Sequence, residues 1–131
     1  MRFVAIAVFA LLPLAALAEG PLDAASFDAR TQGRTITYSQ NGEVYGIEEY
    51  LPDRRVRWAF VGGECHEGTW FQDGQDICFF YEDGADLQCW QFTDTENGLE
   101  ARFRGNPDNQ PLVSLAESRT PLACTEVYHG V

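Results

Sequence analysis

The stretch that decides the fold runs from Tyr50 to Trp90 and reads YLPDRRVRWAFVGGECHEGTWFQDGQDICFFYEDGADLQCW. Within it an aromatic residue recurs every ten residues, at Tyr50, Phe60, Trp70, Phe80 and Trp90. Turn-forming residues follow these aromatics, most clearly as Asp73-Gly74 and Asp83-Gly84. Aromatic residues favour strands, whereas Asp-Gly pairs accept the positive φ of tight hairpin turns. The repeat therefore predicts one strand and one turn per ten residues.

The same alternation extends in both directions, with further hairpin signals at Asn41-Gly42, Gly62-Gly63 and Asn97-Gly98. The strands expected from it cover residues 34–40, 43–51, 54–61, 64–72, 75–82, 86–93, 99–105 and 112–117. The fold class is mostly β: an antiparallel up-and-down meander of about eight strands. Such a meander forms either a lipocalin-like small barrel or a strongly twisted sheet.

One short helix is expected ahead of the strands, over residues 21–30 (PLDAASFDAR). Pro21 suits a first helical position, and Asp23 suits the positive end of the helix dipole. One face would carry the apolar residues Leu22, Ala25 and Ala29, with Phe27 nearby. A helix of this length is not stable alone. We therefore expect it to pack across one face or one open end of the sheet.

Residues 1–18 have the pattern of a signal peptide. Arg2 precedes an apolar run over residues 3–17, and the segment ends in Ala16-Leu17-Ala18, with small residues at both recognition positions of a cleavage site. The run is shorter than the roughly 20 residues of a membrane span, which disfavours the alternative of a retained anchor helix. We expect export to the periplasm or the exterior, without membrane insertion after cleavage, and a single β-meander domain over residues 19–131.

All four cysteines lie after the signal peptide, at Cys65, Cys78, Cys89 and Cys124. An even count in a small exported chain indicates two disulfides, although spacing alone does not fix the pairing. If Asp83-Gly84 is the centre of a hairpin turn, Cys78 lies opposite Cys89 on the neighbouring strand. Cys65 and Cys124 would then tie the tail, residues 118–131, to the sheet.

Turns centred on residues 73/74 and 83/84 also sort the side chains onto two faces. One face collects Trp70, Ile77, Phe79, Tyr81, Trp90 and Phe92. The other collects Thr69, Phe71, Phe80, Leu87 and the Cys78–Cys89 pair. We expect the first face to be the barrel interior, where its aromatic residues either line a ligand pocket or fill the core. The helix or the tail would cover part of the second, and a bulge at Gly62-Gly63 would exchange the faces upstream.

The charge is strongly acidic. The chain has 20 acidic residues, nine arginines and no lysine, for a net charge of −11, which becomes −12 when Arg2 is removed with the signal peptide. Nucleic acid and anionic membranes are poor partners for such a surface, whereas a cationic protein, a cationic small molecule or a divalent metal is favoured. Solubility alone also explains the charge. The absence of lysine excludes Schiff-base chemistry and a P-loop.

The only basic run is Arg54-Arg55-Val56-Arg57. Arg55 and Arg57 share a face, so they would bind a carboxylate or phosphate bidentately. Alternatively, they form ion pairs with Glu48 and Glu49 across the hairpin turn at Pro52-Asp53.

The clearest chemical cluster is Glu64-Cys65-His66-Glu67. Along a strand Glu64 and His66 point one way and Glu67 the other, while Cys65 is expected in a disulfide and His129 lies in the tail. We therefore favour a solvated strand edge over a metal or acid–base site. The two Asp-Gly turns lie at opposite ends of the meander and do not share a calcium ion. We expect no catalytic residue, metal or cofactor.

The order of features resembles a domain-of-unknown-function family, numbered 995, of small exported proteobacterial proteins. The similarity covers about Leu22 to Phe92. It rests on the short helix followed by Gly33-Arg34-Thr35, Gly46-Ile47-Glu48-Glu49-Tyr50, Pro52-Asp53, Cys65-x-x-Gly68-Thr69-Trp70, Ile77-Cys78-Phe79 and Cys89-Trp90. The resemblance implies a lipocalin-like or meander β-domain in the periplasm and brings no catalytic motif.

Three functional hypotheses follow. The first is a non-enzymatic exported β-domain that binds a small apolar ligand or a protein surface through the barrel mouth or an edge. The second is an inhibitor of a cationic, lysozyme-like hydrolase, to which an acidic, disulfide-tied domain is electrostatically suited. The third, an enzyme, is the least favoured because no catalytic motif is present.

Overall fold

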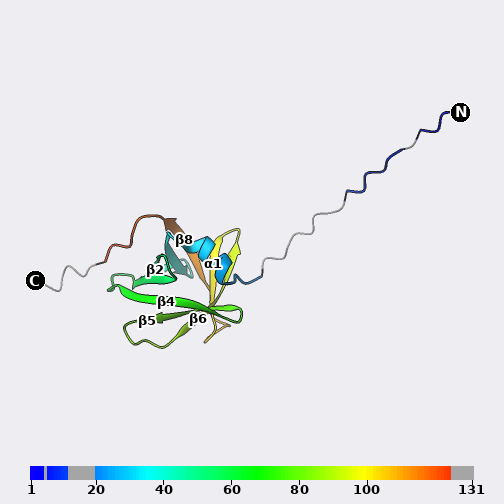
Figure 1. Cartoon of the computed structure of the whole chain (residues 1–131). Coiled ribbons are helices and arrows are strands. Elements are labelled where there is room, and N and C mark those ends of the chain that lie inside the picture. Colours follow the sequence, from blue (N-terminus) through cyan, green and yellow to red (C-terminus); the bar gives the residue numbers. More distant parts are fainter. Residues whose placement is uncertain (5, 12–19, 125–131) are drawn as a thin grey trace, which may run out of the picture.

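A computed structural model describes residues 1–4, 6–11 and 20–124. Eight antiparallel strands follow one helix, and β8 pairs with β1 to close a barrel (Figure 1). The elements are α1 (Ala24–Thr31), β1 (Thr35–Gln40), β2 (Glu43–Tyr50), β3 (Arg55–Phe60), β4 (His66–Asp73), β5 (Asp76–Tyr81), β6 (Gln88–Thr95), β7 (Gly98–Phe103) and β8 (Leu112–Ser118). The predicted mostly β meander is confirmed, in its barrel form.

Two features of the sequence analysis lie outside the described residues: the expected cleavage site at Ala16-Leu17-Ala18, and His129. In the part of the chain that is described, no helix has both the length and the apolar character needed to cross a membrane.

The predicted register of β5 and β6 is confirmed. Cys78 lies opposite Cys89, and the two form a disulfide with their Cα atoms 3.9 Å apart. The carbonyl oxygen of Cys89 accepts the N–H of Arg104, which directly follows β7 on the other side of β6, so the cysteines form a non-hydrogen-bonded pair, the closer kind. Asp83-Gly84 is not a tight two-residue turn, however, because residues 82–87 form a wider loop.

The β4–β5 turn lies one residue later than predicted, at Gly74-Gln75, so Trp70 pairs with Phe79. Moving the centre of a turn by one residue shifts the partner of each residue by two positions. Because side chains alternate between the faces with a period of two, every side chain stays on its predicted face. Gly62-Gly63 lies in the loop between β3 and β4, as its hairpin signal predicted, and not in a strand bulge. The register shifts occur instead in β1, at Thr37–Ser39, against both of its neighbours.

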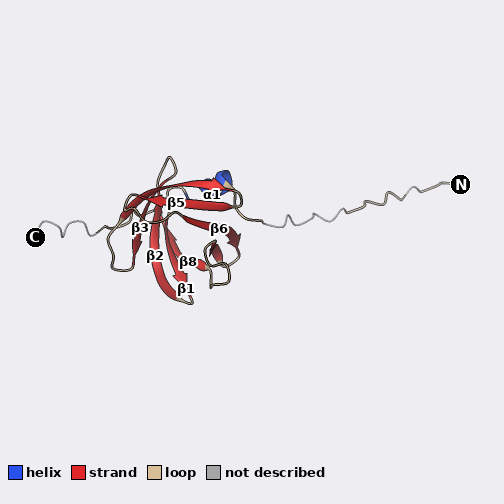
Figure 2. Cartoon of the chain, turned by 90° about the horizontal axis from the view of Figure 1, so that it is seen from below, coloured by secondary structure: helices blue, strands red, loops and turns tan. Residues whose placement is uncertain are grey.

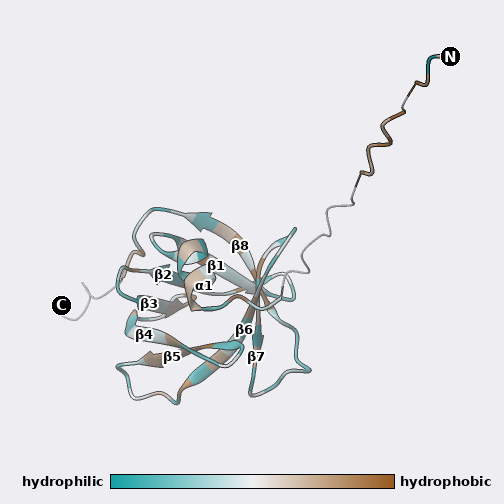
Figure 3. Cartoon of the chain, turned by 45° about the vertical axis from the view of Figure 1, so that its right-hand side comes forward, coloured by the Kyte–Doolittle hydropathy of each residue, from teal (hydrophilic) through white to brown (hydrophobic). Residues whose placement is uncertain are grey.

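The predicted interior face is the core of the barrel. Most of its aromatic residues are buried, and Trp90 is half-buried. On the outer face Phe71, Phe80 and Leu87 are exposed, whereas Cys78 and Cys89 are buried, so the cover expected for part of this face does not reach those three residues. Figure 3 shows hydrophilic and hydrophobic colours mixed along the strands, as expected where one strand face lines the interior and the other faces solvent.

Helix α1, blue in Figure 2, lies against the strands, and its buried Phe27 packs in the core, so α1 closes one end of the barrel. The helix begins after its N-cap Asp23, whose carboxylate accepts the Ser26 N–H, and not at Pro21 as predicted. The reason is that the Leu22 N–H donates to the Phe92 carbonyl of β6, which holds the chain extended up to that point.

The face of α1 that packs inward also differs from the predicted one. Ala25 and Ala29 are exposed, whereas Phe27 and Thr31 are buried. Phe27 is fully buried among four rings, with centroid distances of 5.5 Å to Tyr50, 5.0 Å to Trp70, 6.3 Å to Phe79 and 4.6 Å to Phe92. The barrel end admits one large ring rather than a broad face of small apolar residues.

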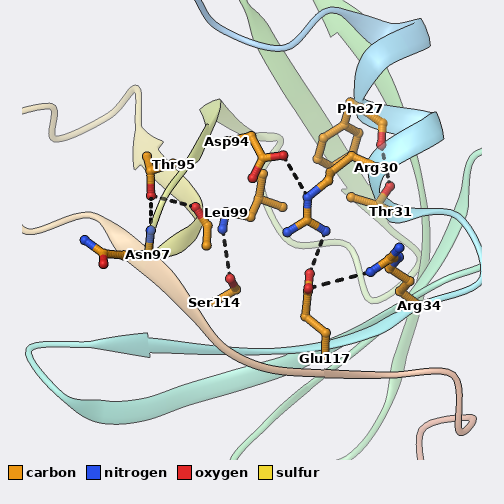
Figure 4. Close-up of polar contacts among 11 residues, drawn as sticks. Phe27, Arg30, Thr31, Arg34, Asp94, Thr95, Asn97, Leu99, Ser114 and Glu117 are labelled. Carbon is orange, nitrogen blue, oxygen red and sulfur yellow. Dashed lines mark hydrogen bonds and ion pairs between the residues drawn. The ribbon is translucent and has the colours of Figure 1, made fainter. Parts of the chain in front are cut away.

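Arg30 completes this closed end (Figure 4). Its Nε lies 3.0 Å from the Asp94 carboxylate of β6, and its Nη1 lies 2.6 Å from the Glu117 carboxylate of β8. Arg34 adds a longer contact, 3.7 Å, to the second oxygen of Glu117. The helix therefore supplies the cation for two acids that the strands bring to this end of the barrel.

The predicted tie between the tail and the sheet is also confirmed. Cys124 forms a disulfide with Cys65, which precedes β4. Between β8 and this bridge the tail crosses the outer wall, where Leu122 donates its N–H to Glu49 and lies near Ile47. The bridge fastens this segment across the outside of the barrel.

Candidate functional site

The barrel holds a cavity of about 90 Å³ at the end opposite α1. It lies where β2, β4, β6 and β8 begin and β3 and β5 end. Its walls are formed by Tyr38, Tyr45, Glu48, Tyr50, Trp58, Phe60, His66, Phe79, Tyr81, Asp83, Ala85, Gln88, Trp90 and Leu112. We call it the mouth cavity. Aromatic rings make up most of its lining, and a few polar groups lie among them.

The polar groups of the interior form two hydrogen-bonded pairs. The hydroxyls of Tyr38 and Tyr50 lie 2.7 Å apart. The Tyr81 hydroxyl donates to Glu48, with its oxygen 2.9 Å from Oε1 and 3.3 Å from Oε2. All four side chains are buried, and Glu48 is only 2% exposed. The cavity therefore has a carboxyl group and phenol groups on its walls.

Strand alternation places Glu48 inside. In β2 it lies opposite Ile36 of β1 and Trp58 of β3, and both of these residues face the interior. Glu49, the next residue, has its side chain on the outer wall beside Arg57. Two adjacent glutamates are thus separated by the sheet, one in the core and one outside.

Burial raises the pKa of Glu48 to about 8, and the hydrogen bond from Tyr81 opposes this only in part. Burial likewise raises the pKa values of Tyr38, Tyr50 and Tyr81, so these phenols stay neutral. At neutral pH the Glu48 carboxyl therefore mostly keeps its proton.

Among the residues that the structure describes, none places an arginine beside Glu48 in this cavity. Of the described residues that line it, only His66 is basic, and its Nδ1 lies 3.1 Å from an Asp83 carboxylate oxygen. Asp83 belongs to the loop of residues 82–87, where it also accepts the Ala85 N–H. The His66–Asp83 pair therefore holds this loop at the rim of the cavity.

Aromatic rings surround the opening. Tyr45, Trp58 and Phe60 contact one another with centroid distances of 5.4 to 5.8 Å, and Phe60 is 51% exposed. Gly46 makes room for this cluster, because a Cβ atom there would lie 2.4 Å from the Trp58 ring. Gly68 does the same for Tyr81, whose ring would lie 2.8 Å from an added Cβ. Two glycines thus let large rings lie flat on the barrel wall.

The predicted aromatic set divides between the two ends of the barrel. Phe79, Tyr81 and Trp90 line the mouth cavity. Trp70 and Phe92 contact Phe27 at the closed end and fill the core. The sequence analysis missed the interior positions of Glu48, Tyr38 and Tyr50. Glu48 lies two residues before Tyr50, so both side chains lie on the same face of the strand. Pairing centred on Asp53 places Glu48 opposite Trp58, on that same face. This pattern could have identified Glu48 as an interior residue.

The predicted anion-binding arginines lie on the outer wall. Arg57 pairs with Glu67 at 2.7 Å and with Glu49 at 3.4 Å, so the expected ion pair to Glu49 is confirmed. The expected pair to Glu48 is wrong, because Glu48 faces the interior. Arg55 is exposed. Two carboxylates already engage Arg57, which disfavours anion binding there.

The structure separates the Glu64-Cys65-His66-Glu67 cluster. His66 lines the mouth cavity, Cys65 is in a disulfide, and Glu67 pairs with Arg57 outside. Across the described ranges there is no group of three or more His, Cys, Asp or Glu residues arranged to hold a metal ion.

Comparison of the chain with protein-family models, curated proteins and solved structures gave no match. The resemblance to the family numbered 995 stays a prediction.

Proposed function

We propose that this protein is a non-enzymatic, exported binding domain that holds a small molecule in the mouth cavity. The observation that carries the proposal is the cavity itself, with its aromatic walls, its buried polar pairs and its position at the one barrel end that α1 does not close. Ligand sites are typically concave and mostly apolar, with a few well-placed polar groups. The two disulfides agree with an oxidising compartment.

The size of the cavity favours a small ligand over a protein partner. About 15 Å³ of such space is enough for one water molecule, so a cavity of about 90 Å³ accepts several waters or a small organic group. It is smaller than the roughly 150 Å³ of an engineered cavity that binds benzene. A ligand would therefore place one end among the buried polar groups and keep the rest at the aromatic rim.

Binding is favoured over catalysis by the chemistry of the lining. Burial keeps the cavity phenols neutral, and all four cysteines are in disulfides. The lining therefore offers neither a thiolate nor a phenolate as a nucleophile.

The test is a binding screen with small aromatic probes: phenol, indole, 2-phenylethanol and 2-phenylethylamine. Trp58 and Trp90 line the cavity, so occupancy should change tryptophan fluorescence in a saturable way. A ligand that binds only the folded state should also raise the melting temperature.

The specificity of the response is checked with two variants of the same loop. Ala85→Trp places a large ring at the rim and should abolish the response. Leu87→Trp is the matched control, because Leu87 is 48% exposed and does not line the cavity. No response to any probe, or an equal response in Ala85→Trp, would overturn the proposal.

A further inference from the structure

We infer that the ligand of the mouth cavity is a small organic amine, and that its protonated nitrogen binds the Glu48 carboxylate. This inference rests on the proposed function and names the chemical class that the cavity would select.

Glu48 differs from the other inward-directed or buried acids in having no cationic partner within the part of the chain that the structure describes. Asp94 and Glu117 share Arg30 at the closed end, and Glu49 pairs with Arg57 on the outer wall. Glu48 has the Tyr81 hydroxyl, which supplies one hydrogen bond and no charge. A buried acid without a partner keeps its proton, and its ionised form is favoured only when a cation pairs with it. An ammonium group in the cavity would supply the partner that the chain does not.

The walls suit an ammonium group as well as its organic body. Tyr45, Trp58, Phe60, Tyr81 and Trp90 all line the cavity, and the faces of such rings attract cations within about 6 Å, most strongly when water is excluded. The hydroxyls of Tyr38 and Tyr50 add acceptor oxygens. The limited volume fits an ammonium group on a short stem, with the apolar body against the rim.

The net charge of the whole chain also favours a cationic ligand. A net charge of −11 favours the approach of cations and disfavours anions. Asp83, whose carboxylate contacts His66, also lies at the rim. An anionic ligand would meet an acidic surface, an acidic rim and a buried acid in turn.

The competing possibility is that protonated Glu48 donates a hydrogen bond to a neutral or anionic acceptor. The two cases differ in whether Glu48 keeps its proton when the ligand binds. An ammonium ligand requires the Glu48 carboxylate, so binding expels the proton, whereas an acceptor ligand requires the proton to stay. The other ionisable groups facing the cavity are Tyr38 from β1, Tyr45 and Tyr50 from β2, His66 from β4, Tyr81 from β5 and Asp83 from the 82–87 loop; β3 contributes only Trp58 and Phe60.

The experiment compares three probes that share a phenyl ring and a two-carbon stem: 2-phenylethylamine, 2-phenylethanol and 3-phenylpropanoate. Calorimetric titration at pH 8.5 should give the amine at least about tenfold tighter binding than the alcohol, with the propanoate weakest. One factor of ten corresponds to a single pKa unit of interaction.

Two matched variants assign the preference to one carboxyl. Glu48→Gln keeps the shape and removes the charge, so the amine should lose at least about tenfold in affinity while the alcohol stays within about twofold. Glu49→Gln makes the same change one residue away, on the outer wall, and should keep the amine preference. Thermal unfolding of each variant verifies that it is folded.

The pH profile separates Glu48 from His66. Below the pKa of Glu48, amine affinity in the wild type should rise about tenfold per pH unit, because one proton leaves for each amine bound. In Glu48→Gln this slope should be absent, although His66 is unchanged.

The outcomes distinguish this inference from the proposed function. If the alcohol or the propanoate binds wild type as tightly as the amine, the amine inference fails and the binding function stands. The amine inference alone also fails if Glu48→Gln keeps the amine preference, or if indole or phenol binds and the amine does not. If no small probe binds at all, both the function and the inference fail.

Discussion

The two ends of this barrel hold acids that face inward, yet among the described residues only the closed end has an arginine that pairs with them. At the closed end Arg30 of α1 lies between Asp94 and Glu117, and Phe27 fills the space among four rings. At the open end Glu48 has a phenol for a partner, and a cavity remains beside it. Among the described residues, the inward-facing acids of the closed end are paired with an arginine. The inward-facing acid without a cationic partner is the one that lies beside a cavity, where a ligand has room to bind.

The largest expected effect comes from making the same substitution at the two ends. Phe27→Ala should lower the free energy of unfolding by about 3–5 kcal/mol, because it leaves a void among packed rings. Phe60→Ala should cost less than about 1 kcal/mol, since that ring is half-exposed at the rim. Urea unfolding of both variants measures the difference. Equal losses would mean that the rim is packed as tightly as the core.

The next effect is the pH dependence of stability at the open end. Glu48 titrates near its ordinary value of 4.5 in the unfolded chain and at about 8 in the folded one. The folded state therefore holds a proton that the unfolded state has lost, and stability falls as pH rises through this window. Relative to wild type, Glu48→Gln should gain up to about 1.4 kcal/mol per pH unit between roughly pH 5 and 8.

The same unfolding series with Glu49→Gln is the control for this window. Glu49 lies on the outer wall, so its variant should keep the slope of wild type. Parallel curves for Glu48→Gln and wild type would show that Glu48 is not held protonated by burial.

The smallest effect removes the cation at the closed end. Arg30→Gln leaves Asp94 and Glu117 without their main partner and should cost about 1–2 kcal/mol, because the pairs are only partly buried. Arg34→Gln removes a longer, more exposed contact to Glu117 and should cost less than about 0.5 kcal/mol. Thermal unfolding compares the two. A larger loss of stability for Arg34→Gln than for Arg30→Gln would contradict the role of Arg30 as the main partner of these acids.

Much of the fold could be predicted from local sequence because turn chemistry and period-two patterns are local. The Asn-Gly and Asp-Gly pairs placed the strands to within a few residues, and the sum of positions around Asp83-Gly84 paired Cys78 with Cys89. That register held although the turn itself is a wide loop, since opposite residues depend on the centre of a loop and not on its width.

The candidate site was harder to predict because it depends on which face is buried. A glutamate in an alternating strand is normally on the solvent side, so Glu48 was grouped with Glu49 as a partner for arginines. Only closure of the barrel places Glu48 against Tyr81, which is 33 residues away. The helix itself was predicted, but its buried face was not, since Phe27 is buried by the shape of the barrel end rather than as part of an apolar face of the helix.

The most direct test of the central claim is a carboxyl carbon NMR titration of Glu48, assigned by the signal that Glu48→Gln removes. In the free protein the midpoint should lie near pH 8, as burial without a cation requires. With saturating 2-phenylethylamine it should fall by at least about one pH unit, because a bound ammonium group stabilises the carboxylate. A midpoint between about 4 and 5 in the free protein, or a midpoint that rises with the amine, would contradict the account.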